Sequence, residues 1–583
     1  MNPVLLLPCC LVVFLGLVFG LGLPVVGGWR LAPGEKICLG AAVGVILLYL
    51  SALVDYWLQL PPLAGGLLPL AALGLLAARW RVCADLLRAP DARRLLGAWL
   101  LVAGWCLGFL ALVRSYSGGR WALDWVEHYD RTLIFLFHRP LNWPLFGGDH
   151  LAARPPLANA ATGRFLAVTS AGFPFFQIFT TLLNSLAFLP GWLFAGRFSR
   201  NPARAQALLT VLFMVNPSVL QNSTFAWTKL ITVFFVLTAL YCLLPALVRG
   251  SRRRLAAAFV FLAAGFLAHY SAGPYAVALV AAYLWWRRRE WTRWRQWRDT
   301  AVCALPAALL LATWFGWSIG AFGVARTFLS TTAVAKSSAV SGTDFLRAGG
   351  HNLVNTLVPH PFRPVNYGAI AQLGKLGYAR DYCFLIYQVN LPVMFGSVGG
   401  LTLLGLLWRR RREPGGPPSG PPAAFWWWFV GCTTVLGVAT VPAGVDYWGV
   451  AHSCLQGLLV LGLAFLAAGV DTLPRWWRHA LFAGLALDFA LGVGLHFYFE
   501  NLEHPLAEAL RDDTRHLLLQ YGVGTAGNLW IKLRRGYEFV GDWAIPRPLL
   551  LGWLAGLLAL AVSRCLATAA AAAGSAEASG TIR

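Results

Sequence analysis

The sequence contains few charged residues. Asp, Glu, Lys and Arg make up 12% of its 583 residues, whereas a soluble globular domain carries about 25%. Hydrophobic residues make up 58%, and the mean hydropathy is +0.62. This composition excludes an ordinary soluble domain.

Several motifs are also missing. The sequence has no phosphate-cradling Walker motif and no H-E-x-x-H pair, which argues against a nucleotide-driven pump and against a zinc hydrolase of the usual type. The 11 cysteines fall mostly inside apolar runs, and no C-x-x-C pair is present. A disulfide framework and a cysteine metal site are therefore not expected. No internal repeat is visible.

Long apolar runs are present instead. Runs of roughly twenty residues recur along the whole chain, which is the length needed to cross a bilayer as a helix. The sequence therefore predicts an all-α, polytopic helical bundle in the membrane, with about fifteen spans and with amphipathic helices in the long outer loops. The predicted spans begin near Pro3, Ile37, Pro61, Leu95, Phe173, Ala205, Lys229, Leu255, Gly273, Ala301, Phe384, Ala424, His452, Ala480 and Pro548.

The distribution of basic residues predicts the orientation. With the N-terminus outside, the loops after odd-numbered spans are cytoplasmic, and these loops hold most of the formal net charge of +23. Short basic loops of this kind follow the positive-inside rule; they include Arg249–Arg254, Arg287–Arg298 and Arg409–Arg412. We expect a plasma (inner) membrane protein with a cytoplasmic C-terminus and a retained first helix. Its charge indicates topology and contact with anionic lipid, and nucleic-acid binding is not expected.

The chain divides by composition. Three outer segments are long, so we expect the function on the outer face. The predicted divisions are an N-terminal addition of three helices (1–94), a membrane core (95–408) with outer loops 114–163 and 319–383, a cytoplasmic Pro/Gly linker (409–423), C-terminal spans (424–566) with outer loop 498–547, and a disordered tail (567–583). Within the last loop, His504–Gly522 has the pattern of an amphipathic interfacial helix.

A cluster of charge follows the fourth span. The segment Asp124–Arg131 reads D-W-V-E-H-Y-D-R, and the sequence around it predicts a helix over 121–137. At about 100° per residue, Asp124, Glu127, His128 and Arg131 fall within one arc of about 100°. A solvated polar face is the alternative interpretation. Two neighbouring carboxylates raise one another's pKa or share a cation, so we take Asp124 and Glu127 as candidate catalytic residues.

Two cations on the outer side are candidate phosphate ligands. Arg154 begins the rigid segment R-P-P-L, and its planar fork suits phosphate or carboxylate. Lys229 begins an apolar helix at the depth of a lipid phosphate, although a snorkelling lysine is the ordinary explanation for such a position.

Further polar residues lie at the predicted outer edges of spans. Each one alone is best explained as a satisfied interfacial residue, but together they could line a cavity that opens outward. Besides His128 and Arg131, the set comprises Tyr129, His269, Tyr270, His360, Arg363, Asp446, Tyr447 and His452. Asp488 lies deep in a span, where we expect it to be paired or to face a cavity.

The acidic motif after a span, the amphipathic first outer loop and the basic-Pro-Pro-Leu segment resemble the glycosyltransferase C superfamily. The likeness is to bacterial relatives of the protein O-mannosyltransferases and aminoarabinose transferases, and it covers roughly Leu95–Trp317. Asp124 and Glu127 take the acidic positions, with Tyr129 as the following aromatic, and Arg154 begins the counterpart of K-P-P-L. Here the acids are separated by two residues and follow the fourth span, not the first.

The resemblance implies transfer of a sugar from a polyprenyl-phosphate donor to a lipid, glycan or protein acceptor on the outer face. Asp124 would be the general base, Glu127 its partner for orientation or for a divalent metal (Mg or Mn), and Arg154 and Lys229 would bind the phosphate. Direct displacement would invert the anomeric configuration. Two alternatives stay open: a transporter or flippase of lipid-linked saccharides, which needs deep coupling acids, and a polysaccharide polymerase or ligase that uses Arg363, His360 and His452.

Overall fold

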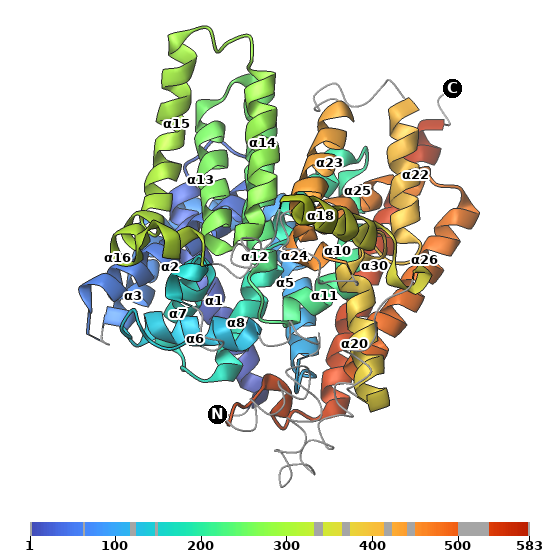
Figure 1. Cartoon of the computed structure of the whole chain (residues 1–583). Coiled ribbons are helices and arrows are strands. Elements are labelled where there is room, and N and C mark those ends of the chain that lie inside the picture. The colour runs from blue at the N-terminus through green and yellow to red at the C-terminus, as the bar shows by residue number, and fades with distance from the viewer. Residues whose placement is uncertain are drawn as a thin grey trace.

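The computed structural model describes residues 3–61, 64–116, 124–145, 150–330, 342–363, 374–412, 423–439, 449–498 and 536–580. Throughout these ranges the regular secondary structure is helical and no strand is present (Figure 1). The predicted all-α class is confirmed, and the many apolar helices are those of a membrane protein.

Seven helices in the described residues are long and apolar enough to cross a membrane. They are Val4–Val26, Pro33–Leu58, Pro90–Leu110, Phe173–Phe198, Lys229–Val248, Arg475–Tyr498 and Arg547–Ala571. The number rises to ten if each of three sharply bent helix pairs counts as one span. The predicted count of about fifteen is not confirmed. Several runs that the hydropathy indicates as spans form shorter helices; one of 14 residues rises about 21 Å, less than the roughly 30 Å of a hydrocarbon core.

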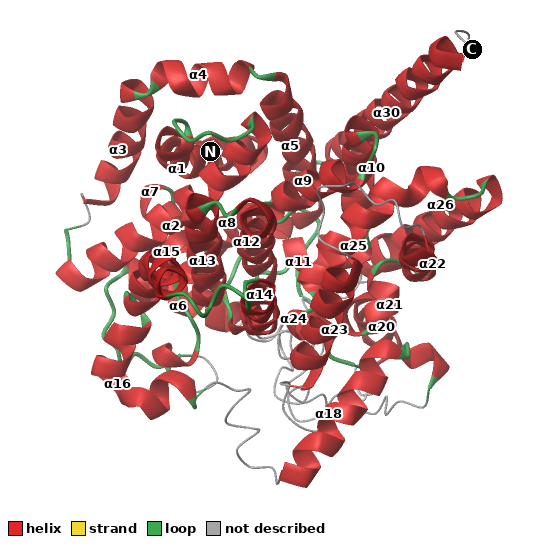
Figure 2. Ribbon diagram, turned by 90° about the horizontal axis from the view of Figure 1, so that it is seen from above, coloured by secondary structure: helices red, strands yellow, loops and turns green. Residues whose placement is uncertain are grey.

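The N-terminal helices pack through small residues. Helix α1 (Pro3–Val26) lies against α2 (Pro33–Leu58), and a Cβ on Gly22 would meet the carbonyl oxygen of Gly40 at 1.8 Å. Such close backbone approach is typical of helix pairs in membranes. Figure 2 shows α3 (Ala64–Ala78), α4 (Trp80–Arg88) and α5 (Pro90–Leu110) in an arc around α1.

Helix α12 (Lys229–Arg249) is at the centre of the bundle. It packs against helices that come from distant parts of the chain, and the residues between its ends are nearly all buried. Its neighbours are α2, α8 (Phe173–Ser185), α9 (Phe188–Phe198), α11 (Pro217–Thr224), α13 (Arg252–Ala268), α14 (Gly273–Trp286) and α25 (Gln456–Gly469). Helix α12 is therefore held firmly by several helices.

The two termini lie at opposite ends of the molecule (Figure 1). The loop that joins α14 to α15 (Trp294–Ala312) lies at the same end as the C-terminus, as does the end of α22 (Gly399–Arg412). Two of the basic segments predicted to be cytoplasmic thus share one end of the bundle, and the first residues of the chain lie at the other.

The long outer segments hold short helices. The first contains α6 (Asp124–Leu136), the 3-10 turn η3 (Leu151–Ala153) and α7 (Leu157–Val168). The second contains α16 (Phe315–Phe328), α18 (Gly342–Leu357) and η5 (His360–Phe362) before α20 (Gly374–Val389). Helix α6 confirms the helix predicted over 121–137 within the residues described, and α18 lies across the bundle in Figure 1. The amphipathic helix predicted at 504–522 falls outside the described residues.

The remaining elements complete the bundle. They are α10 (Pro202–Val215), η4 (Tyr270–Ala272), α21 (Leu391–Met394), α23 (Ala423–Ala439), α24 (Ala451–Cys454), η6 (Val470–Thr472), α26 (Arg475–Phe489), the π-helix η7 (Ala490–Leu495), η9 (Val540–Asp542) and α30 (Arg547–Gly580).

Helices extend into two segments that were predicted to be irregular. Helix α22 continues through Arg412, past residue 409, where the linker was expected to begin. The tail expected to be disordered from residue 567 is helical to Gly580, as the end of α30. Its sequence is rich in alanine, the residue with the highest helix propensity, so the helix continues beyond the apolar span.

Candidate active site

The two acids of the charge cluster lie in the first turn of α6. The positive end of a helix dipole favours acidic side chains at this position, and the buried rings and methyl groups of Trp125 and Val126 hold α6 against the bundle. The side chain of Asp124 is 30% exposed, whereas that of Glu127 is 6% exposed. Asp124 is thus the more accessible of the two carboxylates.

Arg154 joins the two acids. Its Nη2 atom is 2.8 Å from Oε2 of Glu127 and 3.3 Å from Oδ1 of Asp124. The residue before a proline is restricted to extended backbone, and Arg154, which precedes Pro155, has φ −134° and ψ 142°. The R-P-P-L segment therefore directs its cation to the start of α6, and the two motifs that are thirty residues apart form one cluster.

Arg131 is the second cation of the cluster. Its Nε atom donates to Oε1 of Glu127 at 2.7 Å, and its Nη1 and Nη2 donate to the carbonyl oxygens of Leu151 and His150 at 2.7 and 2.9 Å. The side chain is 1% exposed. Arg131 thus fastens the segment before Arg154 onto α6, and we assign it a positioning role.

Trp227 and Lys229 approach Asp124 from the start of α12. The indole Nε1 of Trp227 donates to Oδ2 of Asp124 at 3.1 Å. The ammonium of Lys229 lies 3.8 Å from the centroid of a ring of Trp227, a cation–π contact. Asp124 therefore has Arg154 on one carboxylate oxygen and Trp227 on the other, with Lys229 behind the indole.

Asn184 holds this corner in place. Its Nδ2 donates to the carbonyl oxygen of Trp227 at 2.9 Å, and its Oδ1 accepts the backbone N–H of Ile231 at 3.2 Å. These contacts satisfy backbone groups that are left without helical partners where α11 ends and α12 begins. Sequence reasoning missed both Trp227 and Asn184. The buried amide in the apolar run around Asn184 was the one signal available.

His128 faces a buried amide. Its Nδ1 donates to Oδ1 of Asn159 on α7 at 3.3 Å, and the residue is 2% exposed. Burial, reinforced by the charges of Arg154 and Arg131, lowers the pKa of His128 to about 3. His128 is therefore neutral at physiological pH and is a weaker base than a free imidazole.

Two further histidines of the predicted cavity lie near the cations. Burial lowers the pKa of His269, and the charges of Arg154 and Lys229 lower it further. Its Nδ1 accepts the N–H of Ser271 at 3.0 Å, so its Nε2 carries the proton. The ring of His452 is centred 6.3 Å from that of Trp227. The structure thus brings both histidines to the start of α12.

The two predicted tyrosines are bound to backbone. The hydroxyl of Tyr129 donates to the carbonyl oxygen of Ala171 at 2.6 Å, and that of Tyr270 donates to the carbonyl oxygen of Thr327 at 3.4 Å. Tyr270 is close enough to Arg131 for that cation to act on its pKa, which burial raises to about 12.

His360 and Arg363 make contacts around the end of α18. Nδ1 of His360 is 2.7 Å from Oδ1 of Asn390. Arg363 donates to the carbonyl oxygens of Val358 and Asn355 at 2.8 and 3.0 Å, as cations at helix C-termini do. Both contacts explain these residues structurally. Asp446 and Tyr447 lie outside the described residues.

One serine motif has a structural explanation. The residues Gly316–Gly320 match G-x-S-x-G, but a nucleophile elbow needs a sharp turn between a strand and a helix. Here Ser318 is inside α16, is fully buried, and shares a hydrogen bond of 2.9 Å with the hydroxyl of Thr327.

The two carboxylates are bridged by a cationic side chain. Among the residues that the structure describes, no group of three or more His, Cys, Asp or Glu is placed to hold one. Asp124 and Glu127 share the guanidinium of Arg154, which occupies the position of a bridging cation. The metal predicted at these two acids stays a prediction, and no step below uses it.

No family model and no curated protein matches the chain. Two solved structures of ArnT from Cupriavidus metallidurans do, one bound to undecaprenyl phosphate and one in the apo state. Each is 15% identical to this chain with a TM-score of 0.42, and the match covers 80% of this chain and 76% or 75% of the ArnT chain. The resemblance to the glycosyltransferase C superfamily stays one that rests on the sequence motifs. At this level of similarity, the chemistry has to come from the side chains described above.

Proposed function

We propose that the protein is an inverting membrane glycosyltransferase that moves a sugar from a polyprenyl-phosphate donor to an acceptor on the outer face of the membrane. One observation carries this proposal: an accessible carboxylate, Asp124, lies in direct contact with the fixed cation Arg154 and with Trp227. The ring of Trp227 also holds Lys229, at the start of a helix long and apolar enough to cross a membrane. Such a group combines a proton acceptor with cations for a phosphate.

Asp124 is proposed as the general base. The acceptor oxygen attacks the anomeric carbon while its proton passes to the carboxylate of Asp124, and the bond from the anomeric carbon to the phosphate oxygen breaks. A positioned base contributes about 10²- to 10⁴-fold. The side chain of Glu127 is nearly inaccessible and is held by Arg131 and Arg154, so its proposed role is to position Arg154.

The polyprenyl phosphate leaves as an anion and needs no proton. Its developing charge requires cations, and electrostatic stabilisation of this kind is commonly the largest contribution to catalysis. Arg154 and Lys229 are proposed for this role. The Nε2–H of His269, whose Nδ1 is already bonded to Ser271, is a further donor near these two cations.

The deep acid disfavours the transporter alternative. A coupling acid must exchange a proton or an ion during transport. Asp488 instead accepts hydrogen bonds from the hydroxyl of Tyr387 and from the N–H and hydroxyl of Ser397, at 3.1, 2.7 and 3.1 Å. Asp488 is therefore paired within the bundle. This is one of the two environments that its sequence position predicted, the other being a cavity.

The decisive experiment is a transfer assay. Membranes that contain the wild type, Asp124→Asn, Glu127→Gln or the matched control Asp85→Asn are incubated with radiolabelled polyprenyl-phosphate sugars and cell lipids, glycans and protein. Asp85 is 76% exposed and pairs with Arg88 on α4. We expect transfer in the wild type and the control, and its loss in Asp124→Asn. Equal transfer in all four would refute the site.

The proposed orientation has its own test. A cysteine at exposed Asn142, near the end of α6, should react with a membrane-impermeant maleimide on intact cells more than the wild type does. A cysteine at Arg288, in the basic loop between α14 and α15, should gain labelling only after permeabilisation. The reverse pattern would place Asp124 on the cytoplasmic side and would contradict the proposed reaction on the outer face.

A further inference from the structure

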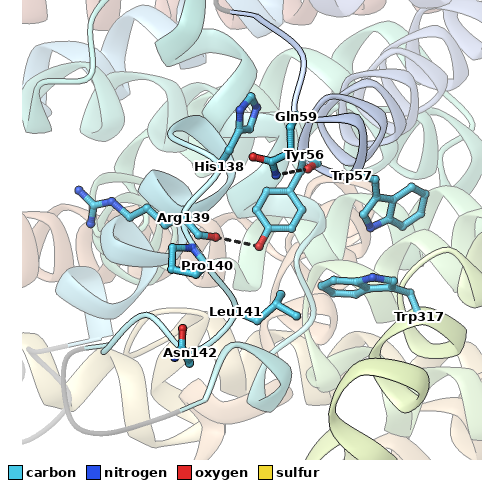
Figure 3. Close-up of a pocket in the computed structure, with 9 residues that line it drawn as sticks. All are labelled: Tyr56, Trp57, Gln59, His138, Arg139, Pro140, Leu141, Asn142 and Trp317. Atoms are coloured by element: carbon cyan, nitrogen blue, oxygen red, sulfur yellow. Dashed lines mark hydrogen bonds between the residues drawn. The ribbon is translucent and has the colours of Figure 1, made fainter.

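A cavity of about 610 Å³ lies at the other end of α6 (Figure 3). Its walls come from the end of α2, the segment after α6 and α16, and its lining residues are Tyr56, Trp57, Gln59, His138, Arg139, Pro140, Leu141, Asn142 and Trp317. Helix α6 begins at Asp124 and ends at Leu136, a rise of about 18 Å. The cavity is therefore separate from the carboxylate site but connected to it by one helix.

One wall of the cavity presents aromatic rings. The rings of Trp57 and Trp317 are centred 6.3 Å apart, and Tyr56 packs edge-on against Trp317 at 6.3 Å. Figure 3 shows the two indoles side by side, with Pro140 and Leu141 nearby. Trp57 is 40% exposed at the end of a membrane span. The two indole planes are tilted by 49° to each other, so the flat apolar face of a ligand can lie on one of them.

The other wall is polar. It carries the amides of Gln59 and Asn142, both exposed, and it contains no Asp or Glu. The guanidinium of Arg139 points away from the indoles in Figure 3 and lies 4.3 Å from the ring of Trp143. Its carbonyl oxygen accepts the hydroxyl of Tyr56 at 2.9 Å. The cavity thus offers amide donors and acceptors beside the rings, and its lining arginine is turned toward Trp143.

The backbone around the cavity is held in an unusual conformation. Gln59 and His138 both have φ of +49°, and among the described residues they are the non-glycine positions in the left-handed region. Both line this cavity. Both positions follow a helix, α2 or α6, and the left-handed conformation lets the next N–H bond back to that helix, from Leu60 to Asp55 at 3.2 Å and from Arg139 to Ile134 at 3.0 Å. Capping thus fixes the two helix ends that meet at the cavity. His138 is held by Asp55, whose Oδ2 lies 3.4 Å from its Nε2 and also pairs with Arg164 of α7.

We propose that this cavity is a subsite for a neutral saccharide ring of the acceptor. A sugar ring has an apolar C–H face for the indoles and a rim of hydroxyls for Gln59 and Asn142, whereas an acyl chain needs no amides. A pocket of rings with a few convergent polar groups is the general form of a small-molecule site. That this saccharide belongs to the acceptor rests on the proposed glycosyl transfer. Saccharide binding itself does not depend on that reaction.

Binding is tested with defined probes. Saturation-transfer difference NMR on the protein in lipid nanodiscs uses methyl glycosides of glucose, galactose, mannose and N-acetylglucosamine as free saccharides, dodecyl glycosides of the same sugars as lipid-linked ones, and dodecanol as the tail alone. We expect at least one sugar to bind in either linked or free form. The proposal would be overturned if the methyl glycosides gave no signal and the dodecyl glycosides bound no better than dodecanol alone.

Variants locate the binding. Trp57→Ala and Trp317→Ala should each weaken the affinity about two- to tenfold, which is the range of an aromatic contact. Asn142→Ala, at an exposed position, should weaken it without any risk to packing. The control is Trp294→Ala, 78% exposed at the opposite end of the molecule. Unchanged affinity in all three cavity variants would overturn the assignment.

The two proposals fail differently. In Asp124→Asn, which lacks the proposed base, saccharide binding should persist. In Trp57→Ala, transfer should continue with a raised KM for the acceptor and an unchanged kcat. Absence of transfer with any donor would refute the reaction while leaving the binding result readable. Transfer with an unaltered acceptor KM in the cavity variants would refute the subsite alone.

Discussion

Asp124 and Asp488 are both acids in a membrane protein, but their surroundings are opposite. Asp124 is partly exposed and touches a guanidinium and an indole N–H. Asp488 is 2% exposed and accepts hydrogen bonds from the neutral groups of Tyr387 and Ser397. Burial of a polar group without partners is costly, so the partners of Asp488 account for it completely as a structural residue.

The difference separates an acid that can react from one that holds the fold. The hydrogen bonds of Asp488 join α26 to α20 and to the turn before α22. At that turn Gly396 has φ +95°, and a Cβ on it would lie 2.6 Å from Oδ2 of Asp488. Asp124 also has partners on other segments, Arg154 and Trp227, but its side chain is 30% exposed. Activity should therefore depend on the Asp124 cluster and stability on Asp488.

The largest expected effect on activity comes from removing the cation beside Asp124. Arg154→Ala should lower kcat/KM for transfer about 10²- to 10³-fold, the usual loss for one group that stabilises a developing anion. Glu127 keeps its contact with Arg131 in this variant, so the protein should still fold. The assay compares it with Arg154→Lys, which retains a cation without the planar fork, and with exposed Arg88→Ala. If Arg154→Ala transferred sugar at a rate within twofold of Arg154→Lys and Arg88→Ala, Arg154 would not belong to the site.

The second prediction compares the two acids by their effect on stability. Asp488→Ala leaves three buried donors without their acceptor and should destabilise the fold by about 3 kcal/mol, seen as a lower thermal midpoint of the purified protein. Asp124→Ala should change that midpoint far less, because its position is partly exposed. If Asp124→Ala proved the less stable of the two, the distinction between the acids would be lost.

Much of the Asp124 cluster could be predicted from sequence because helical periodicity is local. Residues three and four apart share a face, which placed Glu127 and Arg131 together, and the proline after Arg154 restricted its backbone. The contacts from Asn184 and Trp227 could not be predicted, because they come from other helices that only the tertiary fold brings close. The roles of all these residues stay predictions until activity is measured.

The helical class could be predicted, whereas the number of spans could not. Hydropathy measures how apolar a segment is and does not show where its backbone breaks. The run that begins near Ala205 was predicted as one span, but it bends by 65° between α10 and α11, where Pro217 begins α11. The break at His269–Ala272, in contrast, lies where one predicted span ends and the next begins near Gly273. Short helices result where continuous spans were expected.

The third prediction concerns acid sensitivity beside Asp124. His128 has a folded pKa of about 3 against 6.5 unfolded, so the unfolded state binds the extra proton between these values. Its contribution to stability is complete above pH 6.5 and decreases as the pH falls toward 3, by about 2 kcal/mol at pH 5. The thermal midpoint should therefore decrease less from pH 7 to pH 5 in His128→Gln than in the wild type. An equal fall in both would show that His128 does not titrate in this way.

The smallest expected effect is that of metal removal. Arg154 already bridges Asp124 and Glu127, and a divalent ion between these acids would have to displace a cation held by an arginine fixed through Pro155. We therefore expect transfer to be unchanged when membranes are washed with EDTA and assayed in its presence. Activity that EDTA abolishes and Mg²⁺ or Mn²⁺ restores would mean that Arg154 leaves at least one carboxylate when donor binds. Asp124 would then resemble Asp488 even less, as a ligand whose partners change during the reaction.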